Sequence, residues 1–375
     1  MRQYTEMIVV AAMGCVVACQ SMAGGVKYQN DDGHYVKLGG RIQLQYHMMD
    51  LDGGESTDEL LFRRLRPYIE GSVHEDWLGK FQFDLGKSKV EVKDAYAEYK
   101  GLDFATISFG NKNFPFSREL LTSSKKQQLV ERTFVGEHDY GTPERQAGIH
   151  LEGDLLDGHL GWAASVAKGA VDPDNKKLDF DTTISLNKGD DWSEGNMIGG
   201  RIDFHPFGHL KFEQGDFKRD LKATISVAGF GWQNDDDNLD SAREDDVDNV
   251  VGLEISGALR VAGVSIDAQY NQFESDLVDA GITSGLYVDS STTLKNYAVE
   301  GGVMVLPGKV ELVAGYQSQD ADGYAETWDR TSVGVNLFQK KQDIKYQITY
   351  QMGANKDGKA GNDVDELFVQ AQYVF

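Results

Sequence analysis

From residue 34 to the end of the chain, hydrophobic and polar residues alternate in short runs. In the run over residues 36–46, the apolar positions share one side, namely Val36, Leu38, Ile42, Leu44 and Tyr46. The polar positions Lys37, Arg41, Gln43 and Gln45 share the other. A period of two is typical of a β-strand with one apolar face. This pattern alone does not distinguish a soluble β-sandwich from a membrane barrel.

Sixteen such runs can be counted, and they predict an all-β fold. They cover residues 34–48, 59–73, 76–85, 90–100, 104–112, 146–153, 158–168, 196–205, 220–231, 249–259, 262–273, 294–305, 309–318, 330–339, 343–353 and 366–375. The connections mostly alternate between short and long, which is the pattern of outer-membrane barrels with short periplasmic turns and long external loops. Two connections depart from it: 86–89 is short where a long loop is expected, and 206–219 is long where a turn is expected.

The final run, ELFVQAQYVF, favours the membrane barrel over the sandwich. Its apolar residues Leu367, Val369, Ala371, Tyr373 and Phe375 lie on one face, and Phe is the last residue. This ending resembles the C-terminal signature that barrel-assembly machinery recognises in outer-membrane proteins. Because lipid offers no hydrogen bonds to the backbone, a β-sheet can cross it only as a closed barrel. We therefore expect a 16-stranded antiparallel transmembrane β-barrel.

Residues 1–23 have the pattern of a signal peptide. Arg2 provides a positive start, residues 7–17 are apolar, and small residues precede a cleavage site after Ala23. The apolar stretch is shorter than the ~20 residues of a membrane-spanning helix. Residues 16–19 also resemble a lipoprotein processing site, so lipidation at Cys19 stays open as an alternative. We expect export to the periplasm and a single barrel domain over residues 24–375, which contains no cysteine because both lie at 15 and 19.

The formal net charge of −23 disfavours nucleic acid as a partner, since its phosphates need a basic surface. Much of the acidity falls in the predicted long loops, above all in residues 235–248. A solvated external surface explains this simply. Divalent-cation binding, for instance at residues 320–323, is an alternative, although no full calcium-loop spacing is present.

Many basic residues fall instead on the polar side of the predicted strands: Lys37, Arg41, Arg64, Arg66, Lys80, Lys112, Arg201 and Lys222. If the apolar side faces lipid, these project into the lumen. The densest cluster is Arg63, Arg64 and Arg66, in which Arg63 points away unless the strand bulges. Arginine suits phosphate because its planar fork donates two hydrogen bonds and stays charged. The alternative is a ladder of ion pairs that satisfies a polar wall, with Glu70, Asp94 and Glu98 as partners.

One long segment has no strand pattern: residues 113–135, NFPFSRELLTSSKKQQLVERTFV, between two predicted strands. At these residues the chain resembles the phosphate-selective porins O and P of Gram-negative outer membranes. The matching pieces are 119–120, 121–125 and 131–132, and the resemblance extends to FRRLRPYIEG (62–71) and VKDAYAEY (92–99). In that family the third external loop folds into the barrel and narrows the pore.

The resemblance implies a passive channel for phosphate or other small anions in the cell outer membrane, in contact with lipid and lipopolysaccharide, and a homotrimer. Carried over by position, it implies a binding site at Arg63, Arg64, Lys125 and Arg132, with Asp94. We add Arg66 to the expected site because it belongs to the same basic cluster as Arg63 and Arg64. The chain departs from the family where Lys126, Gln127 and Gln128 replace an aromatic residue. Carboxylates at Glu119, Glu131, Glu137 and Asp139 could cancel the basic charge. A general or cation-leaning porin and a barrel-borne adhesin therefore stay open as alternatives.

No sequence motif supports an enzymatic function. Neither a G-x-S-x-G sequence nor a phosphate-binding P-loop occurs in the chain. His205 and His209 have the spacing of a helical metal pair, but Pro206 and Gly208 predict a turn, and no third ligand is near. We therefore expect no enzymatic step, no cofactor and no metal.

The barrel prediction can be tested on the refolded protein. A closed barrel resists detergent at low temperature, so we expect heat-modifiable mobility in detergent gels and β-rich circular dichroism. Helical dichroism, or solubility without detergent, contradicts the barrel.

Overall fold

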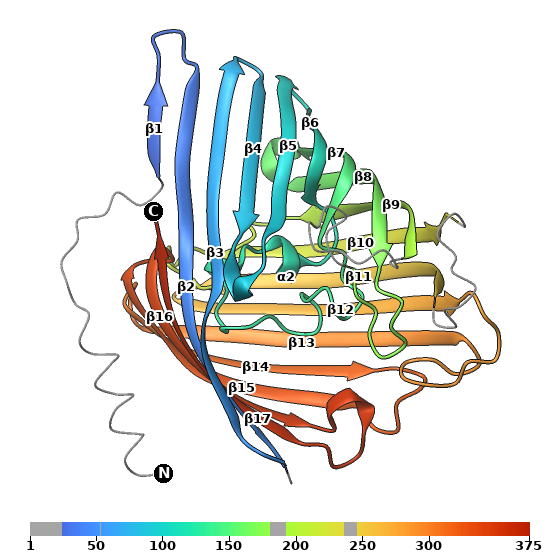
Figure 1. Ribbon diagram of the computed structural model, residues 1–375. Helices are drawn as coiled ribbons and strands as arrows, with labels where there is room; N and C mark the ends of the chain where they lie inside the picture. The colour runs from blue at the N-terminus through green and yellow to red at the C-terminus, as the bar shows by residue number, and fades with distance from the viewer. Residues whose placement is uncertain (1–24, 53, 181–192, 236–245) are drawn as a thin grey trace.

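The computed structural model describes residues 25–52, 54–180, 193–235 and 246–375. Each strand from β2 to β17 pairs antiparallel with the next, and β17 pairs with β2, which closes a 16-stranded barrel (Figure 1). The strands are β2 (Tyr35–Leu51), β3 (Thr57–His74), β4 (Trp77–Asp84), β5 (Glu91–Leu102), β6 (Ala105–Asn113), β7 (Arg145–Leu155), β8 (Leu160–Val171), β9 (Ser193–Phe204), β10 (Lys222–Asn234), β11 (Val247–Val261), β12 (Val264–Leu277), β13 (Ser291–Leu306), β14 (Val310–Asp320), β15 (Trp328–Lys340), β16 (Ile344–Ala354) and β17 (Val364–Val374). The predicted fold class and all sixteen predicted strands are confirmed. The predicted signal peptide, with Cys15 and Cys19, lies outside the described residues.

One short strand, β1 (Val26–Gln29), was not predicted. It forms a hairpin with Tyr35–Leu38 of β2. The pairing of β17 with β2 continues to Phe375, which exchanges two backbone hydrogen bonds with Gly40, and it does not reach Tyr35–Leu38 of β2. β1 therefore occupies the part of this edge that β17 does not reach.

The strands bury polar side chains and expose apolar ones. On β11, Glu254 and Ser256 are 0% and 4% exposed, whereas their neighbours Leu253 and Ile255 are 46% and 52% exposed. In a water-soluble protein the apolar side chains would be the buried ones. The reversal indicates a polar interior and an apolar outer surface. Among the described residues, no helix is long and apolar enough to cross a membrane.

Two β-bulges turn adjacent charged residues toward the interior. The register of β2 with β3 shifts by one residue at Arg63, and that of β4 with β5 shifts at Lys93. A bulge places an extra residue in one strand and redirects its side chain. As a result Arg63 and Arg64 both lie inside the barrel, as do Lys93 and Asp94. The sequence pattern had left the direction of Arg63 dependent on such a bulge.

The short connection between β4 and β5, residues 85–90, folds back onto the bulge of β3. Its backbone N–H at Leu85 donates to the carbonyl oxygen of Leu65, 2.9 Å away. A Cβ atom at Gly86 would lie 2.8 Å from the carbonyl oxygen of Arg63, so only glycine allows this approach. The connection is short because it supports the wall at the bulge.

The connection between β6 and β7, residues 114–144, is the longest in the described chain, and we call it the 114–144 segment. It contains α2 (Arg118–Leu121) and η2 (Ser124–Lys126). Its backbone accepts from or donates to buried polar side chains of strands across the barrel, among them Glu254, Gln269, Gln317, Thr349 and Gln372. Figure 1 shows α2 between the blue strands β2–β5 and the yellow and orange strands behind them.

Aromatic residues anchor the start of the 114–144 segment. Phe114 and Phe116 are fully buried. The Phe116 ring lies 4.9 Å from that of Phe230 and 5.7 Å from that of Phe273, on β10 and β12. These contacts belong to an apolar cluster of buried residues that lies inside the barrel rather than between two sheets.

We expect Phe116→Ala to destabilise the folded protein by roughly 3–5 kcal/mol, because it removes a fully buried ring. The measurement is the temperature at which the compact gel form disappears. Phe81→Ala is the control, since Phe81 is 55% exposed on the outer surface. Equal effects of the two substitutions would show that the segment is not anchored by this cluster.

Candidate functional site

Two cavities lie inside the barrel and meet at a pair of arginines. The first, about 480 Å³, lies toward the end of the barrel with the short turns, and the second, about 650 Å³, toward the end with the long loops. Arg66 of β3 and Arg132 of the 114–144 segment line both cavities. These two side chains therefore lie between the cavities.

The first cavity carries an excess of positive charge. Its described lining has eight basic residues, namely Lys37, Arg41, Arg66, Lys80, Lys112, Lys125, Arg132 and Arg145. Only three acidic residues accompany them, Glu70, Asp94 and Glu152. The barrel interior thus contains a basic chamber although the whole chain is acidic.

The second cavity is close to balanced. Its described lining has nine basic residues: Arg63, Arg64, Arg66, Lys87, Lys89, Lys93, Arg132, Lys177 and Arg330. It also has ten acidic residues: Glu59, Asp84, Glu91, Glu131, Glu137, Asp139, Glu144, Asp172, Asp179 and Glu366. The electrostatic potential therefore becomes more positive from the long-loop end toward the short-turn end.

Glu131 neutralises part of the arginine cluster. Its carboxylate accepts from Nε and Nη2 of Arg63 at 2.6 and 2.8 Å, and lies 3.9 Å from Nη2 of Arg64. Burial raises the pKa of the Glu131 carboxyl, but the charges of Arg63 and Arg64 outweigh burial and hold that pKa below its usual range. Glu131 thus stays ionised, and Arg63 is committed to this pair.

Two more of the predicted site residues also lie in ion pairs of the wall. Arg66 donates to Asp84 at 2.5 Å. Asp94 accepts from Lys80 and from Arg145, both at 2.6 Å. The ladder of ion pairs that the sequence left as an alternative therefore describes these positions well.

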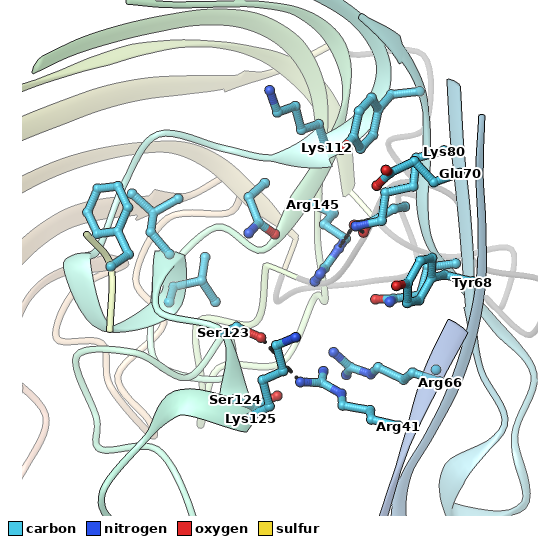
Figure 2. Close-up of a pocket in the computed structure, with 18 of the residues that line it drawn as sticks. Arg41, Arg66, Tyr68, Glu70, Lys80, Lys112, Ser123, Ser124, Lys125 and Arg145 are labelled. Atoms are coloured by element: carbon cyan, nitrogen blue, oxygen red, sulfur yellow. Dashed lines mark hydrogen bonds and ion pairs between the residues drawn. The ribbon is translucent and has the colours of Figure 1, made fainter. Parts of the chain in front are cut away.

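Lys125 and Arg41 are different, because neither forms an ion pair with a carboxylate of the described chain. Arg41 donates to the hydroxyl of Ser123 at 3.3 Å, and its buried Nε finds no hydrogen-bond partner among the described residues. Figure 2 shows Arg41 and Arg66 pointing from the strand wall toward Ser123 and Lys125 of the 114–144 segment. Within the described chain, Arg41 and Lys125 therefore have donors that are free to bind a ligand.

Arg132 completes the group at the point where the cavities meet. Its Nη2 donates to the carbonyl oxygens of Leu120 and Thr122 at 3.1 and 3.3 Å, whereas its buried Nε lacks a hydrogen-bond partner in the described chain. It pairs with no carboxylate of the described ranges. The bonds to the segment's own backbone fix the guanidinium without cancelling its charge.

The environment of Lys125 and Arg132 disfavours their charged forms. Burial, followed by the charge of Arg41, lowers the pKa of Lys125. Burial likewise lowers the pKa of Arg132. Desolvation and like charges both disfavour a cation. An anion that enters the cavity would offset this cost, so the arrangement favours transient anion binding.

The sequence did not single out Arg41, Lys80, Lys93 or Arg145 as site residues. Arg41 and Lys80 were on the basic face of predicted strands, but nothing marked them as close to residues 123–125. Lys93 reaches the interior through a bulge, and Arg145 opens β7 directly after the segment. Their proximity depends on strand register and on the path of the segment, which alternation does not reveal.

Other predicted features lie apart from this site. The rings of His205 and His209 lie 4.9 Å apart in a turn and are tilted by 58°, and no third ligand joins them within the described residues. Of residues 320–323, Asp322 accepts from the backbone of Thr293. Most of the acidic run at 235–248 lies outside the described residues. His138, Asp139 and Asp179 lie within 4.8 Å of one another, but Lys177 already pairs with Asp179 at 2.9 Å.

Comparison with known proteins supports the resemblance. Residues 36–190 match the sequence model of the family described as phosphate-selective porin O and P. All three stretches that carry the resemblance lie in this range, so it is confirmed there. An uncharacterized protein of Aquifex aeolicus (strain VF5) is 24% identical over 383 residues, which cover 91% of this chain and 86% of the relative.

Solved structures with a similar fold are outer-membrane proteins. The trimer form of OmpT of Vibrio cholerae has a TM-score of 0.57 at 15% identity, over 91% of this chain and 99% of that one. The outer membrane channel DcaP of Acinetobacter baumannii has a TM-score of 0.58 at 14% identity, over 94% of this chain and 100% of that one. An anion-selective porin from Comamonas acidovorans has a TM-score of 0.57 at 12% identity, over 91% of this chain and 99% of that one. At these identities the likeness concerns the fold, which is that of outer-membrane porins.

We expect Glu131→Gln to lower stability by roughly 3–5 kcal/mol, because it leaves a largely buried Arg63 without its partner. The same substitution removes a negative charge beside the meeting point of the cavities, so the surviving folded protein should become more anion-selective. Heat modification and bilayer selectivity are the two measurements. Glu326→Gln, in an exposed loop away from both cavities, should change neither. A shift toward cations in Glu131→Gln contradicts this electrostatic assignment.

Proposed function

We propose that residues 24–375 form a single outer-membrane porin domain, a passive diffusion channel for small anions with no enzymatic step. The observation that carries this proposal is the group of cations without a carboxylate partner in the described chain, of which Arg41 and Lys125 line the first cavity and Arg132 lines both. Structural charges of a wall are expected to be paired, as Asp94, Lys80 and Arg145 are. Arg41, Lys125 and Arg132 are buried or half-buried without an acidic partner in the described chain, which suits a ligand that supplies negative charge.

In this proposal the 114–144 segment is an inward-folded third external loop that narrows the pore. Its hydrogen bonds to strands β11–β17 hold the segment on the far side of the lumen. The path then follows the wall of β2–β7, past Arg63 and Arg64, between Arg66 and Arg132, and into the basic chamber beside Lys125. The direction from the long loops to the short turns is that from the cell exterior to the periplasm.

The mechanism is electrostatic. An anion entering from the balanced second cavity loses part of its hydration at Arg66 and Arg132, and the guanidinium and ammonium groups replace those water contacts. Rings of Arg and Lys are an established means of selecting anions or phosphate. Because Lys37, Lys80 and Lys112 continue the basic surface beyond, binding is spread over several weak sites and the anion can leave.

Phosphate is the anion we favour. The guanidinium groups can donate two hydrogen bonds to a tetrahedral oxyanion, and the family description names phosphate. The likeness to an anion-selective porin is consistent with this choice. We further propose a homotrimer in contact with outer-membrane lipid and lipopolysaccharide, for which the trimer form of OmpT and the apolar outer surface are the supporting observations.

A general or cation-leaning porin is the second candidate. The ten carboxylates of the second cavity favour it, because a cation arriving from outside meets them first. The two candidates differ at the narrow point, where anion selection needs charged Arg132 and cation passage does not.

We expect Arg132→Ala and Lys125→Ala each to weaken the block of chloride current by phosphate about tenfold. One charge-assisted hydrogen bond contributes roughly 1.5–3 kcal/mol, and 1.4 kcal/mol corresponds to about a factor of ten. Arg132→Lys should also bind phosphate less well than the wild type, since it lacks the planar fork. The measurement is the phosphate concentration that halves chloride conductance in planar bilayers.

Lys309→Ala is the matched control, because Lys309 lies in a short turn and lines neither cavity. It should leave the phosphate block unchanged. If phosphate blocks the Arg132→Ala and wild-type channels equally, these cations are not the binding site. If phosphate does not block the wild type at all, the phosphate assignment is wrong even though the pore conducts.

A further inference from the structure

The turn between β9 and β10, residues 205–221, is long at an end of the barrel where most turns have two to four residues. The sequence pattern marks it as a departure, and the proposed anion path does not account for it. Its middle approaches the 114–144 segment from the short-turn end. Glu213 pairs with Lys126 of that segment at 3.2 Å.

Gln214, at the centre of this turn, is 2% exposed, and each of its polar atoms forms a hydrogen bond. Its N–H donates to the carbonyl oxygen of Lys126 at 3.1 Å, and its side-chain oxygen accepts from the N–H of Gln128 at 2.7 Å. Its Nε2 donates to Glu300 on β13 at 2.6 Å, and its carbonyl oxygen accepts from Gln342 at 3.2 Å. One residue therefore links the segment to the strand wall and to another turn.

The residues on either side of Gln214 hold the turn inside the barrel. The carbonyl oxygen of Glu213 accepts from Arg260 at 2.7 Å, and Asp216 accepts from the N–H of Gly263 at 2.7 Å. The Phe212 ring lies 5.5 and 5.4 Å from the guanidinium carbons of Arg118 and Arg201 and lines the first cavity. A turn fixed by this many buried contacts is not a solvent-exposed connection.

We propose that the 205–221 turn is a second constriction element, which enters the barrel from the short-turn end and clamps the 114–144 segment in place. Gln214 is its positioning residue, and Phe212 forms part of the pore wall. Glu213 neutralises Lys126, so that Lys125 and Arg132 are the segment's cations left without a carboxylate in the described chain. The effect on conduction rests on the proposed porin function, whereas the clamp itself does not.

The clamp can be tested without any channel measurement. A carbodiimide joins an amine to a carboxylate only when the two are in contact, so treatment of the folded wild type should give a cross-linked peptide pair containing Lys126 and Glu213. Mass spectrometry of the digest detects it. The pair should be lost in Glu213→Gln and after heat unfolding. If the folded wild type yields no such pair while other surface pairs are cross-linked, the clamp is wrong.

The effect on the pore is tested with Gln214→Ala, which removes the side-chain bonds to Gln128 and Glu300. We expect higher single-channel conductance, more current noise and a smaller phosphate block, because the 114–144 segment loses its fixed position. Gln233→Ala, on the exposed face of β10, is the control. Gln214→Ala channels that match Gln233→Ala in all three quantities would overturn the role of the turn as a constriction element.

A third variant covers the case in which Gln214→Ala does not fold. Replacing residues 212–215 by two glycines shortens the turn and removes the tip completely, and it should raise conductance further. If the cross-link forms but the wild-type barrel carries no current, the clamp stands and the porin function fails. If the wild type conducts but the cross-link does not form, the porin function stands and the clamp fails.

Discussion

Closure of the sheet is the constraint on which the rest of this structure depends. A barrel in lipid must pair every backbone group with a neighbouring strand and expose apolar side chains outward. The polar residues of all sixteen strands are thereby forced into one interior, where charges must be paired or solvated. Asp94 with Lys80 and Arg145, and Glu131 with Arg63, meet that requirement within the chain. Arg41, Lys125 and Arg132 have no carboxylate partner in the described chain, and the anion site we propose rests on this exception.

In the channel we propose, two insertions shape the interior from opposite ends. The 114–144 segment is anchored by buried aromatic rings and by hydrogen bonds to the far strands, and the 205–221 turn meets it through Gln214. Together they fill one side and leave the basic strands β2–β5 bordering the open side. The asymmetry of charge follows from this arrangement, because carboxylates of the long-loop end balance the second cavity, whereas few reach the first.

Alternation alone was enough to predict the sixteen strands, since a period of two survives wherever one face is apolar. The segment at 113–135 was recognisable because it lacked that period, and its resemblance to a family suggested a role. The site was only partly predictable. Arg63 and Lys93 point inward through bulges, each of which is a local shift of one residue in register. Arg41 belongs to the site because residues 123–125 lie beside it, 82 positions away in the case of Ser123. The clamp by Gln214 was visible only as a turn of unexpected length.

The sign of the charge that the pore selects decides between the proposed anion channel and a cation-leaning porin. The most direct measurement is the zero-current potential of the wild-type protein in a planar bilayer that separates concentrated from dilute potassium chloride, at neutral pH. The unpaired cations predict a potential of the sign set by chloride permeation, and its magnitude should fall at high ionic strength as the charges are screened. A potential of the sign set by potassium would contradict the account, because the carboxylates of the second cavity would then control selection.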